Sequence, residues 1–302
     1  MHYELIIIGA GSAGFPAGMY ASRYNIKNLI IGAMPGGALA TSHKVENYPG
    51  TISASGKDIM DNFRHHAETA GSEILFDTVK EVSKENNIFT IMTESNKVFT
   101  SDFVILATGN KYRQLGVPGE REFLGKGVSY CATCDAMFFK NRDIAIVGGG
   151  NSALTEALYL ADICKSVKLI HRKDTFRAED IWVQQVKKKE NIELVLNEEV
   201  KEIKGSLFVE EVELKSGKNL KVDGIFVAIG SDPFTHIVDG LNPQKDEEGC
   251  LIVDKRQQTS VVGLYAAGDV STNSNKFKQA IMSAAEGCLS ANSVHEDILH
   301  RG

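Results

Sequence analysis

Near its start the chain reads Leu5-Ile6-Ile7-Ile8-Gly9-Ala10-Gly11-Ser12-Ala13-Gly14, and this stretch carries the clearest indication of its fold. The four apolar residues are too few for a helix and rich in β-branched side chains, so they predict a buried strand. The glycines follow at once in the spacing G-x-G-x-x-G, and an Ala-rich helical pattern continues to about Arg23. With the second apolar run Leu29-Ile30-Ile31, this order indicates a βαβ unit that binds a dinucleotide pyrophosphate.

The same pattern recurs in the middle of the chain. Ile144-Ala145-Ile146-Val147 predicts a second buried strand, and Gly148-Gly149-Gly150-Asn151-Ser152-Ala153 follows it. Ala153 replaces the third glycine, which the fingerprint allows. One such motif is a weak signal, but two copies, each between a strand and a helix pattern, are much stronger. We therefore predict an α/β protein with two Rossmann-like dinucleotide-binding domains.

The second unit is expected to be inserted into the first. Each unit closes on a strand that ends in glycine, at residues 103–109 and 225–230, and turn residues follow both strands. These turns read as crossings between domains. The prediction is one domain made of residues 1–112 and 246–302, interrupted by a second domain of residues 113–245.

Length and composition narrow the classes of function. The 302 residues suit two domains at ~150 residues each. A net charge of −6 gives no reason to expect nucleic acid or an anionic membrane as a partner. No apolar run approaches the ~20 residues that span a bilayer, and Met1-His2-Tyr3-Glu4 is not a signal peptide. We expect a cytoplasmic protein without nucleic-acid or membrane partners.

The most reactive motif is the pair Cys131-x-x-Cys134. No second pair or paired histidine motif accompanies it, so a closed zinc site lacks ligands and no metal is expected. Two thiols at this spacing can close a disulfide and accept two electrons, or they can be buried structural cysteines. Asp135 follows directly and could act as a general acid or as a helix cap. The remaining cysteines, Cys164, Cys250 and Cys288, are expected in the core.

Cations cluster at one strand end. His171, Arg172, Lys173 and Arg177 follow the strand 167–170 of the second unit. This is where a nucleotide's 2′-phosphate is recognised, although a solvated basic loop is the alternative. The first unit has no such cluster after Ile31.

On these motifs the chain resembles the low-molecular-weight thioredoxin reductases, a family of two-domain flavoproteins. The matches run along the whole chain and include Val45-Glu46-Asn47-Tyr48-Pro49-Gly50, Cys131-Ala132-Thr133-Cys134-Asp135 and Gly268-Asp269-Val270. The resemblance implies FAD, NADPH, a homodimer and a thioredoxin-like protein substrate. It also implies that the inserted domain rotates about residues 110–118 and 230–246, so that dithiol and nicotinamide reach the flavin in turn.

The resemblance also assigns residues. It implies that Cys134 lies next to the flavin, that Cys131 attacks the substrate disulfide and that Asp135 protonates a leaving thiolate. FAD contacts are expected from Gly9, Gly11, Ser12, Ala13, Gly14, Gly36, Gly37, Asn47, Gly109, Gly268, Asp269, Lys278, Gln279 and Ala280. NADPH contacts are expected from Gly148, Gly150, Asn151, Ser152, Ala153, His171, Arg172, Lys173 and Arg177.

Two departures and two rival functions stay open. Lys173 stands where the family usually has Arg, and Ala38 where a Gln often lies against the flavin. One rival is a reductase fed by ferredoxin or another electron carrier, against which the second glycine motif and its cations argue. The other is a nucleotide-binding redox sensor without turnover.

Overall fold

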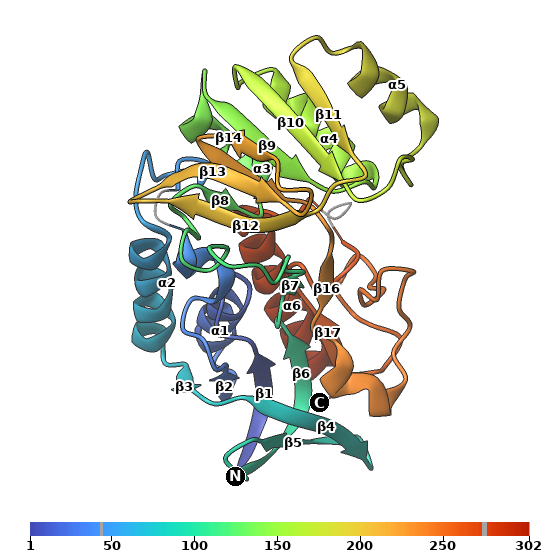
Figure 1. Ribbon diagram of the computed structural model, residues 1–302. Helices are drawn as coiled ribbons and strands as arrows, with labels where there is room; N and C mark the ends of the chain where they lie inside the picture. Colours follow the sequence, from blue (N-terminus) through green and yellow to red (C-terminus); the bar gives the residue numbers. More distant parts are fainter. Residues whose placement is uncertain (43–44, 274–276, 302) are drawn as a thin grey trace. The chain divides into compact units, whose positions relative to one another are not determined.

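The computed structural model describes residues 1–42, 45–273 and 277–301, and the chain divides into two compact units (Figure 1). Unit 1 comprises Met1–Lys111 and Asp232–Gly302, and unit 2 comprises Tyr112–Ser231. The return crossing lies earlier than the sequence suggested, since residues 232–245 belong to unit 1. The reason is η3 (His236–Leu241), which buries Ile237 and Val238 in the core of unit 1.

Unit 1 is built on a mixed sheet in the order β3-β2-β1-β6-β5-β4, with β17 also paired to β6. The strands β1, β2, β3, β6 and β17 run parallel to one another, whereas β5 is antiparallel to both β6 and β4 and extends the sheet with β4. Their bounds are β1 (His2–Ile8), β2 (Asn28–Ile31), β3 (Glu73–Leu75), β4 (Val79–Glu85), β5 (Ile88–Thr93), β6 (Val98–Leu106) and β17 (Leu264–Ala266).

The side chains of β1 alternate between the two cores of unit 1. Leu5 and Ile7 pack toward α1 (Gly14–Arg23) and α6 (Ala280–Arg301), whereas Ile6 and Ile8 pack on the opposite face. This follows from the two-residue period of a strand. Helix α2 (Gly56–Ala70) packs against α1, and the short η1 (Gly37–Thr41) against α2. Because both faces are covered, the apolar run at the start of the chain has no polar alternation.

Unit 2 holds a parallel sheet in the order β11-β10-β9-β15-β8. A separate antiparallel sheet, in the order β12-β13-β14, packs through its apolar side chains into one of the two cores of the unit. The helices are α3 (Ala132–Asp135), α4 (Asn151–Ala161) and α5 (Asp180–Lys188), with η2 (Ala136–Phe139) after α3. The strands are β8 (Val128–Ser129), β9 (Asp143–Val147), β10 (Ser166–His171), β11 (Ile192–Leu196), β12 (Val200–Gly205), β13 (Val209–Leu214), β14 (Asn219–Lys221) and β15 (Gly224–Val227).

The chain passes between the units through β7 (Asn110–Tyr112) and β16 (Ser231–Pro233), which pair with each other as a two-stranded sheet. Among the described residues, no helix has the length and apolar character needed to cross a membrane.

Candidate active site

The first glycine turn joins β1 to α1 in unit 1. A Cβ at Gly9 would lie 2.1 Å from the Ala107 carbonyl oxygen, and one at Gly14 only 1.7 Å from the carbonyl oxygen of Gly9. A Cβ at Gly11 would meet nothing nearer than the Gly37 Cα, 3.8 Å away. The outer glycines are thus required by packing, whereas a Cβ at the middle one would make only ordinary van der Waals contacts. This is the division expected where backbone approaches a pyrophosphate.

Two further turns converge on this one. Gly36 and Gly37 have positive φ angles, and the Gly36 amide donates to the Ala10 carbonyl at 2.7 Å. Gly268, also with positive φ, comes so close to Ala13 that its Cβ would lie 3.3 Å from the Ala13 Cβ. The carboxyl ends of parallel strands meet at one edge of a sheet, and ligands of open α/β sheets bind there.

Most other residues assigned to FAD lie within the same unit. The Asn47 side-chain amide donates to Gln279 Oε1 at 3.0 Å, although 232 residues separate them along the chain. Gly109 has a φ of +68° with open space around its Cβ position, and its carbonyl accepts from the Phe234 amide. Burial raises the pKa of the Asp269 carboxyl, and the charge of Lys278 opposes this rise. Asn47 and Gln279, assigned separately from the sequence, therefore lie in contact.

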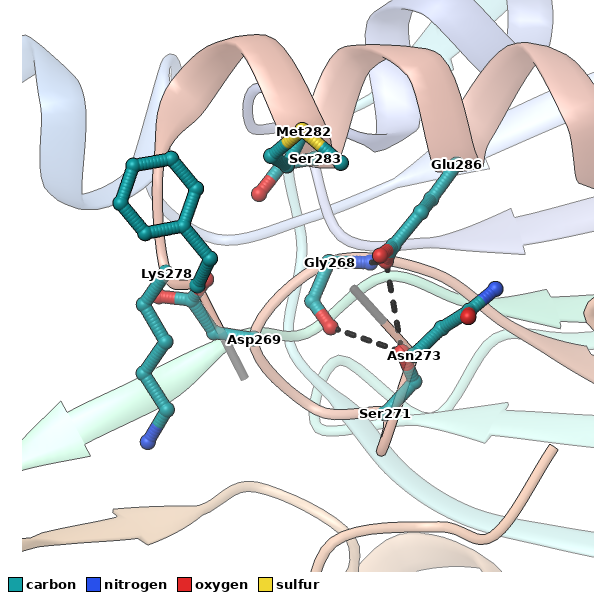
Figure 2. A pocket seen from close by; sticks show the side chains of 9 residues that line it. Gly268, Asp269, Ser271, Asn273, Lys278, Met282, Ser283 and Glu286 are labelled. Atoms are coloured by element: carbon teal, nitrogen blue, oxygen red, sulfur yellow. Dashed lines mark hydrogen bonds between the residues drawn. The ribbon is translucent and has the colours of Figure 1, made fainter. Parts of the chain in front are cut away.

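Glu286 is a site residue that the sequence did not indicate. It lies on α6, is only 5% exposed, and accepts from the Gly268 amide at 2.7 Å and the Ser271 hydroxyl at 3.3 Å. Figure 2 shows its carboxylate reaching from the helix to the turn that carries Gly268 and Asp269. Glu286 is the acidic residue within positions 280–294 of the last helix, among small, apolar and uncharged polar residues, and this was the available signal.

The second glycine turn joins β9 to α4 in unit 2. A Cβ at Gly148 would lie 2.4 Å from the Ala228 carbonyl oxygen and 2.5 Å from the Ala153 Cβ, whereas Gly150 has nothing within 4 Å. Helix α4 begins directly after Gly150, so its free N–H groups face that open space. Asn151 exchanges hydrogen bonds with Glu179, at 2.8 Å to the Glu179 amide and 2.9 Å to its carboxylate.

The His171 ring supports this turn from inside. It is 8% exposed, stacks on Phe176 and contacts the Thr175 carbonyl oxygen through Nε2 at 3.1 Å. A Cβ at Gly149 would lie 2.1 Å from the ring. Burial lowers the pKa of His171, and so do its cationic neighbours. The buried ring packs the turn, and the lowered pKa favours its uncharged form.

Three cations surround the same turn from outside. Arg172, Lys173 and Arg177 are exposed, and all three are close enough to His171 to lower its pKa. The Arg177 amide also donates to the Gly149 carbonyl at 2.8 Å, which ties the basic segment to the glycine turn. Positive charge and open backbone therefore occur together, as a phosphorylated nucleotide requires.

Cys131 and Cys134 form a disulfide at the start of α3, with Cα atoms 5.3 Å apart. The Cys131 carbonyl accepts from the amides of Cys134 and Asp135, which closes the turn around the pair. Both cysteines are half-buried, so the disulfide is accessible. The structure therefore does not place them as buried structural cysteines.

Asp135 is the last residue of α3, and its side chain caps neither α3 nor η2. Its Oδ2 accepts from the Ser129 hydroxyl at 2.5 Å. Burial raises the pKa of this carboxyl, and the bond from Ser129 opposes the rise. Asp135 directly follows Cys134 in the sequence, and a raised pKa favours the protonated form that a general acid needs.

The remaining cysteines have different surroundings. Cys164 and Cys250 are buried as expected, whereas Cys288 is half-buried. Burial raises the pKa of both Cys164 and Cys288 to about 11, so these thiols stay protonated near neutral pH. Their chemistry is therefore distinct from that of the redox pair.

The two glycine turns fit phosphates, because a side chain at Gly11 or Gly150 would fill space that the backbone leaves open. Two dinucleotide turns and an accessible disulfide on one chain define an oxidoreductase that links a nucleotide to disulfide chemistry. Residues 3–287 match the family described as pyridine nucleotide-disulphide oxidoreductase, and the chain belongs to it.

Curated relatives and solved structures support this family membership along nearly the whole chain. A thioredoxin reductase of Buchnera aphidicola is 41% identical over 96% of this chain and 95% of its own. A protein of Pseudomonas fluorescens named glucosaminate ammonia-lyase is 42% identical over 96% of this chain and 94% of its own. The crystal structure of thioredoxin reductase from Streptococcus pyogenes superposes with a TM-score of 0.93, at 34% identity and 99% coverage of both chains. The predicted fold class, the family resemblance and the oxidoreductase class are confirmed.

Proposed function

We propose that the chain is an NADPH-dependent thioredoxin-disulfide reductase. The observation that carries this is the accessible Cys131–Cys134 disulfide, followed directly in the sequence by Asp135, a carboxyl whose pKa is raised by burial. Both lie in a chain with two dinucleotide turns, so an electron source and an electron acceptor are present together.

In this proposal the flavin is FAD, and unit 1 binds it. The glycine turn and the N-terminus of α1 hold its phosphates, and the converging turns hold the rest. When bound, it accepts a hydride from a nicotinamide and passes two electrons to a disulfide. The residues are Gly9, Gly11, Ser12, Ala13, Gly14, Gly36, Gly37, Asn47, Gly109, Gly268, Asp269, Lys278, Gln279 and Ala280.

NADPH is the nucleotide that unit 2 would hold. Gly148, Gly150, Ser152 and Ala153 offer backbone to the pyrophosphate at the N-terminus of α4, and Arg172, Lys173 and Arg177 bind the 2′-phosphate. Asn151 and His171 support the site by holding Glu179 and the Gly149 turn.

The dithiol then reduces the substrate by exchange. Two electrons break the Cys131–Cys134 bond and leave one thiol and one thiolate. The Cys131 thiolate attacks a substrate disulfide, and the substrate sulfur that leaves takes a proton from Asp135. Cys134 then attacks Cys131, restores the disulfide and releases the reduced substrate. Asp135 recovers its proton from the Cys134 thiol, so two electrons have moved in total.

Three parts of the proposal rest on the family resemblance. These are the thioredoxin-like protein substrate, the homodimer and the cytoplasmic location. The relative named for ammonia elimination does not change the choice, because removing ammonia from a substrate needs no dithiol. An enzyme fed by ferredoxin or another carrier would have no use for the cations at Arg172 and Arg177.

The test is NADPH oxidation coupled to an added thioredoxin, measured with the flavin-loaded enzyme. We expect Cys134→Ser to abolish thioredoxin reduction while the flavin is still reduced by NADPH. Cys164→Ala, which removes a thiol from the core of the same unit, is the control and should retain turnover. Undiminished turnover in Cys134→Ser would reject the dithiol route, and a flavin that stays oxidised with NADPH would favour the carrier-fed alternative.

A further inference from the structure

Ser129 is a buried residue whose hydroxyl joins two parts of the redox centre. It ends β8 and is 4% exposed. Its Oγ lies 2.5 Å from Asp135 Oδ2, 3.1 Å from the Cys131 amide nitrogen and 3.4 Å from the Cys131 carbonyl oxygen. One side chain therefore contacts both the acid and the backbone of a redox cysteine.

The donor and acceptor groups determine the direction of these hydrogen bonds. The Cys131 amide can only donate, so the Ser129 oxygen accepts there. The single hydroxyl proton then has two acceptors in reach, and an ionised Asp135 carboxylate is the stronger one. When Asp135 carries a proton, the carboxyl can donate to Ser129 and the hydroxyl proton can turn to the Cys131 carbonyl. Rotation of its hydroxyl about the Cβ–Oγ bond therefore lets Ser129 hydrogen-bond with both the protonated and the ionised form of Asp135.

We propose that Ser129 is a positioning residue of the redox centre, whose hydroxyl holds the Asp135 carboxyl in place for proton exchange with the thiols. This rests on the proposed function, in which Asp135 protonates a leaving thiolate. In that step the O–H bond of Asp135 breaks and an S–H bond forms. The new carboxylate then receives the hydrogen bond of Ser129, and no electrons move.

Among the described residues, no charged side chain contributes to the pKa shift of Asp135. Burial and the Ser129 bond are the two causes that act on the pKa of Asp135. The helix α4, which packs against α3, carries two titratable side chains, Glu156 and Tyr159, and burial alone raises the pKa of Glu156 to about 7. The elements β8, β15 and η2 carry no titratable side chain, so the remaining groups are the thiols of Cys131 and Cys134.

The experiment compares the pH profile of thioredoxin-dependent turnover in Ser129→Ala, Ser129→Thr, Asp135→Asn and the double variant Ser129→Ala/Asp135→Asn. Removing a bond to the ionised carboxylate raises the pKa of the acid. We therefore expect Ser129→Ala to move the basic limb upward by about one pH unit. Because the carboxyl also loses the bond that holds it in place, turnover at neutral pH should slow about tenfold. Ser129→Thr keeps the hydroxyl and should restore the wild-type profile.

The control is Ser101→Ala, which removes another fully buried serine hydroxyl, one that donates to the Phe103 carbonyl in unit 1. It should leave the pH profile unchanged. Anaerobic flavin reduction by NADPH, followed for every variant, should also stay unchanged, because it precedes proton exchange at the thiols.

The double variant separates positioning from folding. If Ser129 acts through Asp135, the double variant is no slower than Asp135→Asn alone. The proposal would be overturned if the double variant were slower than Asp135→Asn by about the factor seen in Ser129→Ala alone. It would also be overturned if the pH profile of Ser129→Ala were unshifted while Asp135→Asn is impaired. Both outcomes leave the proposed function intact. Wild-type turnover in Asp135→Asn would overturn the role of Asp135 as well.

Discussion

Lys173 lies in the proposed nucleotide site at a position where arginine is expected from the resemblance to the thioredoxin reductase family. A lysine keeps the charge but lacks the planar fork with which arginine binds a phosphate through two hydrogen bonds. We expect Lys173→Arg to raise the preference for NADPH over NADH several-fold, through a lower KM for NADPH. The measurement is kcat/KM with each nucleotide. Lys187→Arg on α5, an exposed position outside the site, is the control and should not change the ratio.

At the same scale, sequence motifs predicted which glycines matter but not which side chains support them. The spacing around Gly9 and Gly148 is local, so it can be seen in the sequence. Glu286 acts through a hydrogen bond to a turn 18 residues earlier in the chain, and Ser129 through bonds to the nearby Cys131 and Asp135. The residue types alone do not indicate these bonds, because they depend on how the backbone folds between the partners. His171 stays a predicted nucleotide contact, and its buried ring packs under Gly149, which the sequence did not indicate.

In the turn between β9 and α4, the neighbouring residues Gly149 and Gly150 differ in the space around their Cβ positions. A methyl group at Gly149 would overlap the His171 ring, whereas one at Gly150 has open space. We expect Gly149→Ala to destabilise the fold by roughly 1–3 kcal/mol, as overpacking does. Gly150→Ala should leave the melting temperature unchanged and raise the KM for NADPH at least tenfold, because the methyl group occupies the phosphate position.

Thermal unfolding and steady-state kinetics of the two variants test this contrast. Equal loss of stability in both would show that Gly150 is required by packing. A wild-type KM in Gly150→Ala would show that no phosphate approaches that backbone.

The helix α6 holds the Gly268 turn through one carboxylate. We expect Glu286→Ala to weaken flavin binding at least tenfold, because the Gly268 amide loses its acceptor and the turn loses its fixed conformation. Glu286→Gln keeps an acceptor oxygen and should bind flavin more tightly than the alanine variant. The flavin dissociation constant, measured by fluorescence, tests this, with the exposed Glu296→Ala on the same helix as control. Equal flavin affinity in Glu286→Ala and wild type would contradict the role given to the turn.

For the whole molecule, the repeated strand–turn–helix pattern was enough to predict two dinucleotide units, one inserted in the other. The return crossing was harder to place, because Asp232-Pro233 and the residues after it are turn-rich and also supply Ile237 and Val238 to a core. Composition does not distinguish a linker from a short helical turn whose two apolar residues are buried by distant strands.

In the proposed mechanism, electrons from NADPH reach the sulfurs of Cys131 and Cys134. The most direct measurement is to mix the flavin-loaded protein anaerobically with NADPH, block free thiols with an alkylating reagent and locate the labels by mass spectrometry. We expect both Cys131 and Cys134 to become labelled after NADPH and to stay unlabelled without it, while Cys164 does not respond to the nucleotide. A flavin that is fully reduced by NADPH while the Cys131–Cys134 disulfide stays intact would contradict it.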